Sequence, residues 1–169
     1  MIEAKNGKKN ESEHIIGILV DDHPGVMSKL CGLFARRGFN INSIIVGKTD
    51  KPGLTHIVIS LVADNRTIEQ VEKQINKLID VVKITDLSPQ HSVVREHCLV
   101  RVSSTESSRD AIVNLAKLKD AKVLNVNHTS IILELVDSPQ KIDNFLEMLA
   151  KYGVKELSRT GINAMQNGN

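Results

Sequence analysis

The sequence predicts an α+β fold with two ferredoxin-like βαββαβ domains in tandem. Short runs rich in Ile, Val and Leu are typical of strands, and they are separated by segments whose apolar residues recur three and four positions apart, as in helices. The order strand, helix, strand, strand, helix, strand occurs twice. A polar segment containing Pro89 separates the two repeats. We therefore expect domains over 14–88 and 93–169, joined by a linker over 89–92.

The composition fits two small cores and a chain without a strong net charge. Of the 169 residues, 41% are hydrophobic and only 2% are aromatic, so Ile, Val and Leu must fill the cores. Lys and Arg number 22 against 20 Asp and Glu, a balance that gives no reason to expect nucleic acid or a membrane surface as a partner. No apolar run reaches the length of a transmembrane helix.

Two further features bear on the compartment. Residues 1–13 are polar and charged, so we expect a flexible tail there and no signal peptide. Cys31 falls in a helical pattern and Cys98 in a strand pattern, which is typical of buried free thiols in a reducing environment. The sequence therefore predicts a soluble cytoplasmic protein.

The first domain opens with the apolar run HIIGILV, a strand over 14–20, followed at once by a helix. Pro24 fits the first helical turn, where its missing N–H would have no partner, so Asp22 or His23 is expected at or beside the N-cap. The helix is expected to end at Gly38, after a basic pair. Its apolar face is formed by Val26, Met27, Leu30, Leu33 and Phe34.

This helix start is a candidate binding site. The backbone N–H groups of Gly25, Val26 and Met27 would lack intrahelical partners, and such a terminus attracts a carboxylate or another anion. Gly25 has no Cβ, so a ligand could approach its backbone closely. The alternative is an ordinary capped helix start that binds nothing.

The rest of the first domain follows from turn and helix signals. Strands over 40–48 and 54–62 flank the turn sequence TDKPG and should form a hairpin. The spacing of Thr67 and Gln70 is that of a capping box that opens a second helix, and a last strand is expected over 81–87. The apolar face of this helix comprises Ile68, Val71, Ile75, Leu78 and Ile79.

The second domain repeats the order with different residues. Its first helix is expected over 105–120, and its second begins at Ser138 and Pro139, with Ser as the cap and Pro at the first helical position, and ends at Gly153. The expected strands are 93–103, 121–127, 130–136 and 154–161, and the terminal MQNGN is expected to fray.

No catalytic constellation emerges from the sequence. The six histidines are scattered, no His or Cys pair has zinc-site spacing, and neither a P-loop nor G-x-S-x-G is present. Asp21, Asp22 and His23 could form a metal or acid–base cluster, but adjacent residues on a loop point in different directions. We therefore predict no catalytic residue and no metal, and a sensor more readily than an enzyme.

One long motif resembles a known family. The segment DDHPGVMSKLCGLFARRGFNINSI is similar to the first half of an ACT domain, a small-molecule-sensing module, and most of all to that of the regulatory small subunit of acetohydroxyacid synthase, or acetolactate synthase. The likeness continues through the hairpin and second helix, through VVREHCLVRV and to SRTGINAM. Three departures stand out: Asp22 replaces a usual Asn, His56 replaces a common Arg, and LKDAKVLNV differs from the usual strand entry.

The resemblance implies that the first domain is an ACT domain and that the chain is a non-catalytic regulatory subunit of branched-chain amino acid biosynthesis. Such a subunit binds and activates a thiamine-dependent catalytic subunit and mediates feedback inhibition by valine or another branched-chain amino acid. It implies no cofactor in this chain, with thiamine diphosphate, Mg and FAD belonging to the catalytic partner. The alternative is a free-standing ACT-type amino-acid sensor that acts on a different partner.

The resemblance also places the effector between two ACT domains paired as a homodimer. Six residues match the effector positions: Asp22, Gly25, Val26, Met27, Asn40 and Ile41. The amides at the helix start would receive the ligand carboxylate, and Asn40 and Ile41 of the neighbouring protomer would complete the site. Asp22 could pair with the ligand ammonium, or it could cap its own helix and repel the carboxylate.

Overall fold

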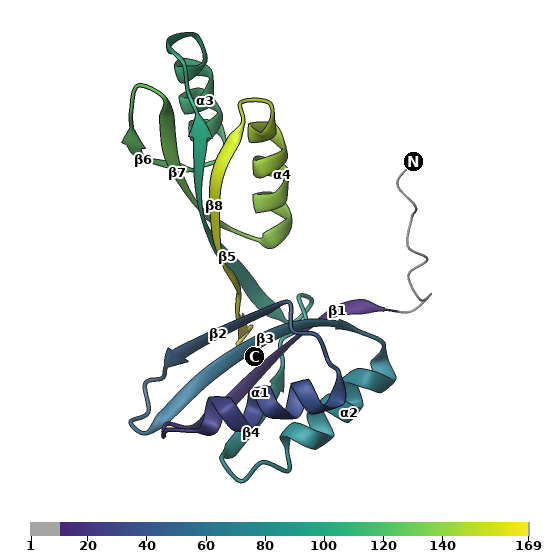
Figure 1. The fold of residues 1–169 in the computed structure, drawn as a ribbon. Coiled ribbons are helices and arrows are strands. Elements are labelled where there is room, and N and C mark those ends of the chain that lie inside the picture. The colour runs from purple at the N-terminus through teal and green to yellow at the C-terminus, as the bar shows by residue number, and fades with distance from the viewer. Residues whose placement is uncertain (1–10, 169) are drawn as a thin grey trace. The chain divides into compact units, whose positions relative to one another are not determined.

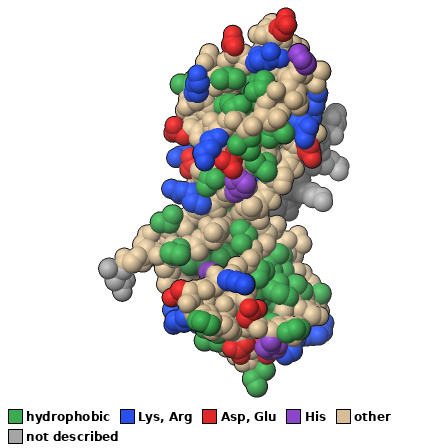
Figure 2. Space-filling view, turned by 90° about the vertical axis from the view of Figure 1, so that its left-hand side faces the viewer, with side chains coloured by type: hydrophobic (Ala, Val, Ile, Leu, Met, Phe, Trp, Pro, Cys, Tyr) green, Lys and Arg blue, Asp and Glu red, His purple; other side chains and the backbone are tan. Residues whose placement is uncertain are grey.

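The computed structural model describes residues 11–168, which divide into two compact units. One unit takes the chain up to Val93 together with the residues from Ala164 onward, and the other is Val94–Asn163. Each unit has a four-stranded antiparallel sheet and two helices (Figure 1). On the face shown in Figure 2, basic and acidic side chains of the described residues are interspersed, in keeping with the balanced charge of the sequence.

The first unit has the expected βαββαβ order. Its elements are β1 (Ser12–Asp21), α1 (Val26–Arg37), β2 (Ser43–Lys48), β3 (Leu54–Ala63), α2 (Asn65–Ile75) and β4 (Val81–Asp86). The strands lie in the order β2-β3-β1-β4, so β1 and β3 are central and β2 and β4 are the edges. This is the ferredoxin-like arrangement, and the predicted fold class is confirmed.

The second unit repeats this topology. Its elements are β5 (Ser92–Ser103), α3 (Glu106–Leu118), β6 (Lys122–Val126), β7 (Ser130–Asp137), α4 (Pro139–Ala150) and β8 (Val154–Gln166), with strand order β6-β7-β5-β8. Ser92, the first residue of β5, lies inside the segment expected to be a linker.

The core of the first unit lies between its sheet and helices α1 and α2. Alternate residues of β1, namely Ile16, Ile18 and Val20, face the helices and are at most 2% exposed. The buried cluster comprises Ile16, Ile18, Val20, Val26, Leu30, Leu33, Phe34, Ile57, Ile59, Leu61, Ala63, Val71 and Ile75. The inward-facing residues of the strands and the apolar faces of the two helices therefore form one buried layer.

A separate cluster fills the second unit. Phe145 and Leu149 of α4 and Ile112 of α3 are fully buried against the sheet. The complete cluster is Cys98, Val100, Val102, Ile112, Ala116, Ala121, Ile131, Leu133, Leu135, Ile142, Phe145 and Leu149, and none of these belongs to the first cluster.

The two thiols differ. Cys98 is buried as expected, and burial raises the pKa of its thiol, so the neutral form is favoured. Cys31 is exposed on α1, so the expectation of burial was wrong for this residue. Its position in the helix, next to the buried Leu30, left it on the outer side of the apolar face.

The chain start differs from the expected flexible tail over 1–13. Ser12 and Glu13 already belong to β1 and pair with the end of β3. The expected strand therefore began two residues too late, because polar residues on an exposed strand end give no apolar signal. Residues 1–10 lie outside the described residues.

Helix α2 begins at Asn65, before the predicted capping box. Its N-cap is Asp64, whose side chain accepts a hydrogen bond of 2.7 Å from Thr67 N, so Thr67 is inside the first turn and not the cap. The helix ends at Ile75, so Ile79, predicted on the inner face, lies beyond it and is 91% exposed.

The last strand is longer than expected. β8 continues beyond Gly161 to Gln166, because Ile162 and Ala164 extend its alternation and are buried. Gln166 Nε2 donates to the carbonyl oxygen of Asp86 at 3.3 Å, so the residues expected to fray are bonded within the first unit. The second unit therefore ends before the expected boundary at the C-terminus.

A buried ion pair ties three elements of the second unit together. Arg159 of β8 donates from Nε to Glu96 Oε1 at 2.8 Å and from Nη2 to Glu96 Oε2 at 2.5 Å. Its Nη1 also donates to Asp143 Oδ1 of α4 at 2.6 Å. Glu96 of β5 is only 5% exposed, and its hydrogen bonds raise the pKa of Arg159. The bidentate pair thus neutralises a carboxylate in the core of the sheet.

We predict that Arg159→Leu lowers the free energy of unfolding of the second unit by about 3 kcal/mol, because Glu96 then remains buried without a cation. Urea denaturation followed by the fluorescence of Tyr152, the single tyrosine, measures this change. The control is Glu156→Gln, whose partner Arg101 lies in an exposed pair at 3.1 Å, and which should change stability by about 0.5 kcal/mol or less. Equal effects of the two variants would contradict the prediction.

Candidate functional site

The turn between β1 and α1 depends on Gly25. This residue is the N-cap of α1 and takes φ 96° and ψ −16°, a left-handed conformation that L residues with side chains rarely adopt. No atom lies within 4 Å of the position that a Cβ would occupy. The backbone here is therefore both exposed and approachable.

Three backbone amides at this turn have no acceptor among the described residues. The first bond of α1 runs from Lys29 N to Gly25 O at 3.0 Å, and none of the hydrogen bonds found involves the N–H of Gly25, Val26 or Met27. The first turn contains no acidic residue that could offset the positive end of the helix dipole. The turn therefore presents a group of donors to which an anion can bind.

The predicted cap residues are not the cap. Helix α1 has no side-chain cap bond and its N-cap is Gly25, so neither Asp22 nor His23 fills that role. Asp22 is exposed, and its N–H donates to Gly53 O at 2.8 Å. Of the two roles considered for Asp22, capping its own helix is not found.

A buried aspartate that the sequence did not indicate holds this turn. Asp80, directly before β4, is 5% exposed and accepts from His23 Nε2 at 2.9 Å through Oδ1 and from Lys29 Nζ at 2.7 Å through Oδ2. Its backbone oxygen accepts from Asp21 N at 2.9 Å. One residue thus fixes the end of β1, the loop and the second turn of α1.

The electrostatics of this cluster favour its charged form. The hydrogen bond from Lys29 is the largest influence that lowers the pKa of Asp80, and that from His23 adds to it. The pKa of His23 is raised, first by its bond to the carbonyl oxygen of Pro24 at 3.0 Å and then by its bond to Asp80. A carboxylate bonded to Lys29 and to His23 thus supports the turn that carries the open amides.

Asn40 and Ile41 lie at the other end of α1. Strand β2 begins at Ser43, so both residues belong to the segment before it and not to the strand start that the sequence predicted. Asn40 is exposed and Ile41 packs partly against the first core. The twelve residues of α1 span about 18 Å, so one chain does not bring these two residues to the turn at Gly25.

The structure therefore divides the six predicted residues into two groups. Asp22, Gly25, Val26 and Met27 share the turn between β1 and α1. The other two, Asn40 and Ile41, can reach such a turn only if it belongs to another chain.

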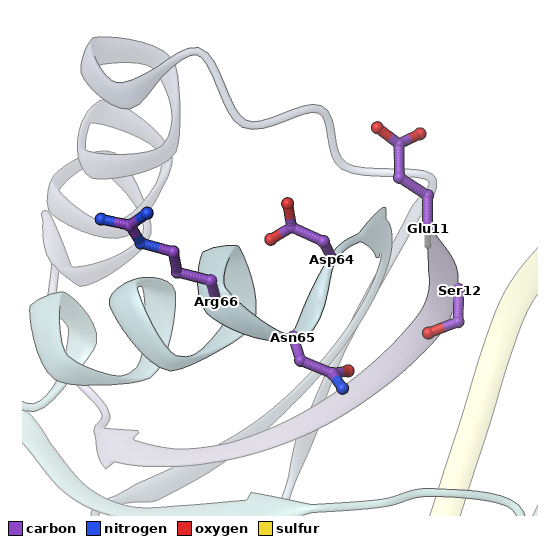
Figure 3. A pocket seen from close by; sticks show the side chains of 5 residues that line it. All are labelled: Glu11, Ser12, Asp64, Asn65 and Arg66. Atoms are coloured by element: carbon purple, nitrogen blue, oxygen red, sulfur yellow. The ribbon is translucent and has the colours of Figure 1, made fainter. Parts of the chain in front are cut away.

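A separate hollow of about 640 Å³ lies at the opposite end of β1 (Figure 3). Its lining comes from the start of β1 and the start of α2 and comprises Glu11, Ser12, Asp64, Asn65 and Arg66. Ten strand residues place it about 30 Å from the turn between β1 and α1. All five lining residues are polar or charged, and none is a hydrophobic residue.

The described part of the chain shows neither a metal centre nor a membrane-spanning helix. Within residues 11–168 no group of three or more His, Cys, Asp or Glu side chains lies close enough to hold a metal ion. None of the helices described has the length and apolar character needed to cross a membrane.

Comparison with known proteins places both halves of the chain. A family model described as the AHAS small subunit-like ACT domain matches residues 16–83, and one described as the small subunit of acetolactate synthase matches residues 95–168. The first model therefore covers the turn at Gly25 and the second covers the Glu96–Arg159 pair.

Relatives and a solved structure match over nearly the whole length. Two proteins named as probable acetolactate synthase small subunits are 44% identical (Methanothermobacter thermautotrophicus, 92% of this chain and 93% of the relative) and 41% identical (Archaeoglobus fulgidus, 93% and 98%). The crystal structure of the acetolactate synthase small subunit from Thermotoga maritima is 41% identical with a TM-score of 0.86, over 94% of this chain and 99% of that one. The chain therefore belongs to the family of acetolactate synthase small subunits.

Proposed function

We propose that this protein is the non-catalytic regulatory subunit of an acetolactate synthase and that its ACT domain binds a branched-chain amino acid, most readily valine. The observation that carries the proposal is the group of three open amides at the N-terminus of α1. This group coincides with the motif by which the first domain resembles the ACT domains of such subunits.

The turn has a donor or contact for each part of an amino acid. The amides of Gly25, Val26 and Met27 suit the ligand carboxylate, because donors and helix dipole act together. The carboxylate of Asp22 suits the α-ammonium, since it is exposed on the same turn and does not cap α1. The partly buried Met27 and Ile41 offer apolar surface for a branched side chain.

A second copy of the chain would complete the site. Asn40 and Ile41 lie about one helix length from Gly25; Asn40 is exposed and Ile41 is partly exposed, so both can contact the turn of a partner. Strand β2 is an edge strand with a single neighbour, β3, within the described residues, and unpaired edges invite pairing with another chain. We therefore propose a homodimer through the ACT domain, in which an effector favours one arrangement by its differential affinity.

The partner and its cofactors follow from the family. A small subunit implies a large one, and we propose that the thiamine-dependent catalytic subunit, with thiamine diphosphate, Mg and FAD, is the partner, while this chain holds no cofactor. The match of residues 95–168 to a model of this small subunit weighs against a free-standing amino-acid sensor, which would need only the first domain.

The first expectation concerns activity. The isolated chain should form no acetolactate from pyruvate, and it should raise the rate of the catalytic subunit when the two are mixed. A colorimetric acetolactate assay with and without each subunit measures both. Turnover by the isolated chain, or an unchanged rate of the catalytic subunit, would contradict the proposed role.

The second expectation concerns effector binding. Gly25→Asp places a carboxylate where the ligand carboxylate should bind, so valine binding measured by calorimetry should be lost. Asn40→Ala should weaken binding by about 0.5–1.5 kcal/mol, or about 2- to 13-fold, because one directional hydrogen bond is removed. Both variants should still activate the catalytic subunit.

Gly153→Asp is the matched control for the first of these variants. Gly153 has φ 87°, so the substitution carries similar backbone strain in the other unit, and valine binding should persist. If Gly25→Asp and Asn40→Ala both bind valine as the wild type does, the site assignment is wrong.

The third expectation concerns Asp22. Since Asp22 does not cap α1, we propose that its carboxylate pairs with the ligand ammonium. Asp22→Asn, which restores the residue usual in the family, should therefore weaken valine binding by about 1 kcal/mol, or about fivefold, in the same titration. Tighter binding would show that Asp22 repels the ligand carboxylate.

A further inference from the structure

We propose that His23 and Asp80 form a latch that orients the Gly25 amide for the effector, and that the latch closes only when the His23 ring is protonated on both nitrogens. The proposal rests on the proposed function, since it assigns positioning residues and a pH response to the same site.

The hydrogen bonds of His23 require the charged ring. Nδ1 lies 3.0 Å from Pro24 O and Nε2 lies 2.9 Å from Asp80 Oδ1. A backbone carbonyl and a carboxylate are both acceptors, so each ring nitrogen must donate a proton. A neutral imidazole carries one N–H and can make only one of these bonds. Both bonds therefore exist together only in the imidazolium.

The bond to Pro24 acts directly on the candidate site. The carbonyl of Pro24 and the N–H of Gly25 belong to one planar peptide unit, in which they point in opposite directions. A donor that fixes the Pro24 oxygen therefore fixes the direction of the Gly25 N–H. Polarisation along such a chain of bonds also makes that N–H a better donor.

Asp80 anchors the other side of the ring. Its side chain is 7% exposed, and it is held from the opposite oxygen by Lys29 Nζ at 2.7 Å. Its backbone oxygen bonds to the N–H of Asp21, so the anchor is tied to β1 as well. The latch thus connects the turn at Gly25 to Asp80, directly before β4.

The charges around the ring set the direction of the pH response. Asp80 and Lys29 face the ring. Asp21 and Asp22 precede His23 in the chain; the backbone N–H of His23 donates to Asp21 O at 3.2 Å, and neither carboxylate bonds to the ring. The bonds to Pro24 and Asp80 raise the pKa of His23 above its usual value near 6.5. The latch is therefore fully formed below about pH 6.5 and is lost as the pH rises through the raised pKa.

The experiment is a valine titration of the whole protein by calorimetry at several pH values, with His23→Gln as the non-titrating variant. Wild-type binding should weaken about fivefold as the pH rises through the pKa of His23, the factor expected for one hydrogen bond, and His23→Gln should lack this step. Titration of valine itself is common to both proteins and cancels in the comparison.

Two further variants separate a latch from a merely structural contact. Asp80→Asn removes the anion that favours the charged ring, so the midpoint of the pH step should move down. Lys29→Met removes the cation that opposes it, so the midpoint should move up. Opposite shifts are not expected from a general loss of stability. The proposal would be overturned if valine binding by the wild type showed no pH step, or if neither variant moved the midpoint of that step.

Nuclear magnetic resonance tests the latch without any ligand. The Gly25 amide resonance should titrate with the same midpoint as the His23 ring in the wild type and should be insensitive to pH over this range in His23→Gln. If valine fails to bind at every pH, the proposed function is wrong. The dependence of the Gly25 resonance on the titration of His23 still decides in that case whether the latch exists. A Gly25 resonance that ignores the His23 titration would refute the latch even if valine binds.

Discussion

In each unit, the neutralisation of one buried carboxylate fixes the relative positions of several elements. Asp80 and Glu96 are the acidic residues that are buried within residues 11–168, and each is bonded to cations far away in the sequence. A buried charge without a partner is strongly destabilising, so the geometry around each carboxylate is tightly constrained. In the first unit this constraint fixes the turn before α1, and in the second it fixes β5, β8 and α4. The first of these contacts holds the turn that carries the candidate site.

Local pattern predicted most of the fold, because most strands and helices carry apolar residues at the spacing typical of their kind. Ile16 and Ile18 face the core at alternate positions of β1, and β5 alternates regularly in the second sheet. Strand β3 is instead buried at each position from Ile57 to Leu61. Errors arose where a boundary depends on polar residues. Asp64 caps α2 three residues before the predicted cap, since an aspartate and a threonine are equally plausible caps by sequence. The strand beyond Gly161 was missed because a glycine in the sequence is a common signal for the end of a strand.

The candidate site was only partly predictable for a different reason. The open amides follow from a proline and a glycine next to one another, which is a local signal. Asp80 has no such signal: it is a lone acidic residue between Ile79 and Val81, and its partner His23 is 57 positions away. The pairing of Asp80 with His23 depends on the strand order, which places β4 beside β1. Pairing of this kind can be proposed from sequence only after the topology is known.

The length of α1 has a consequence for stoichiometry and mass action. It keeps the turn at Gly25 and the segment at Asn40 about 18 Å apart, so each chain holds two different halves of the proposed site. In a two-fold pairing each half of one chain meets the other half on its partner, which gives two equivalent sites per pair and one per chain. A ligand that needs both halves binds only the paired form, and it therefore shifts the monomer–dimer equilibrium as it binds. The response to the effector would then depend on the concentration of the protein itself.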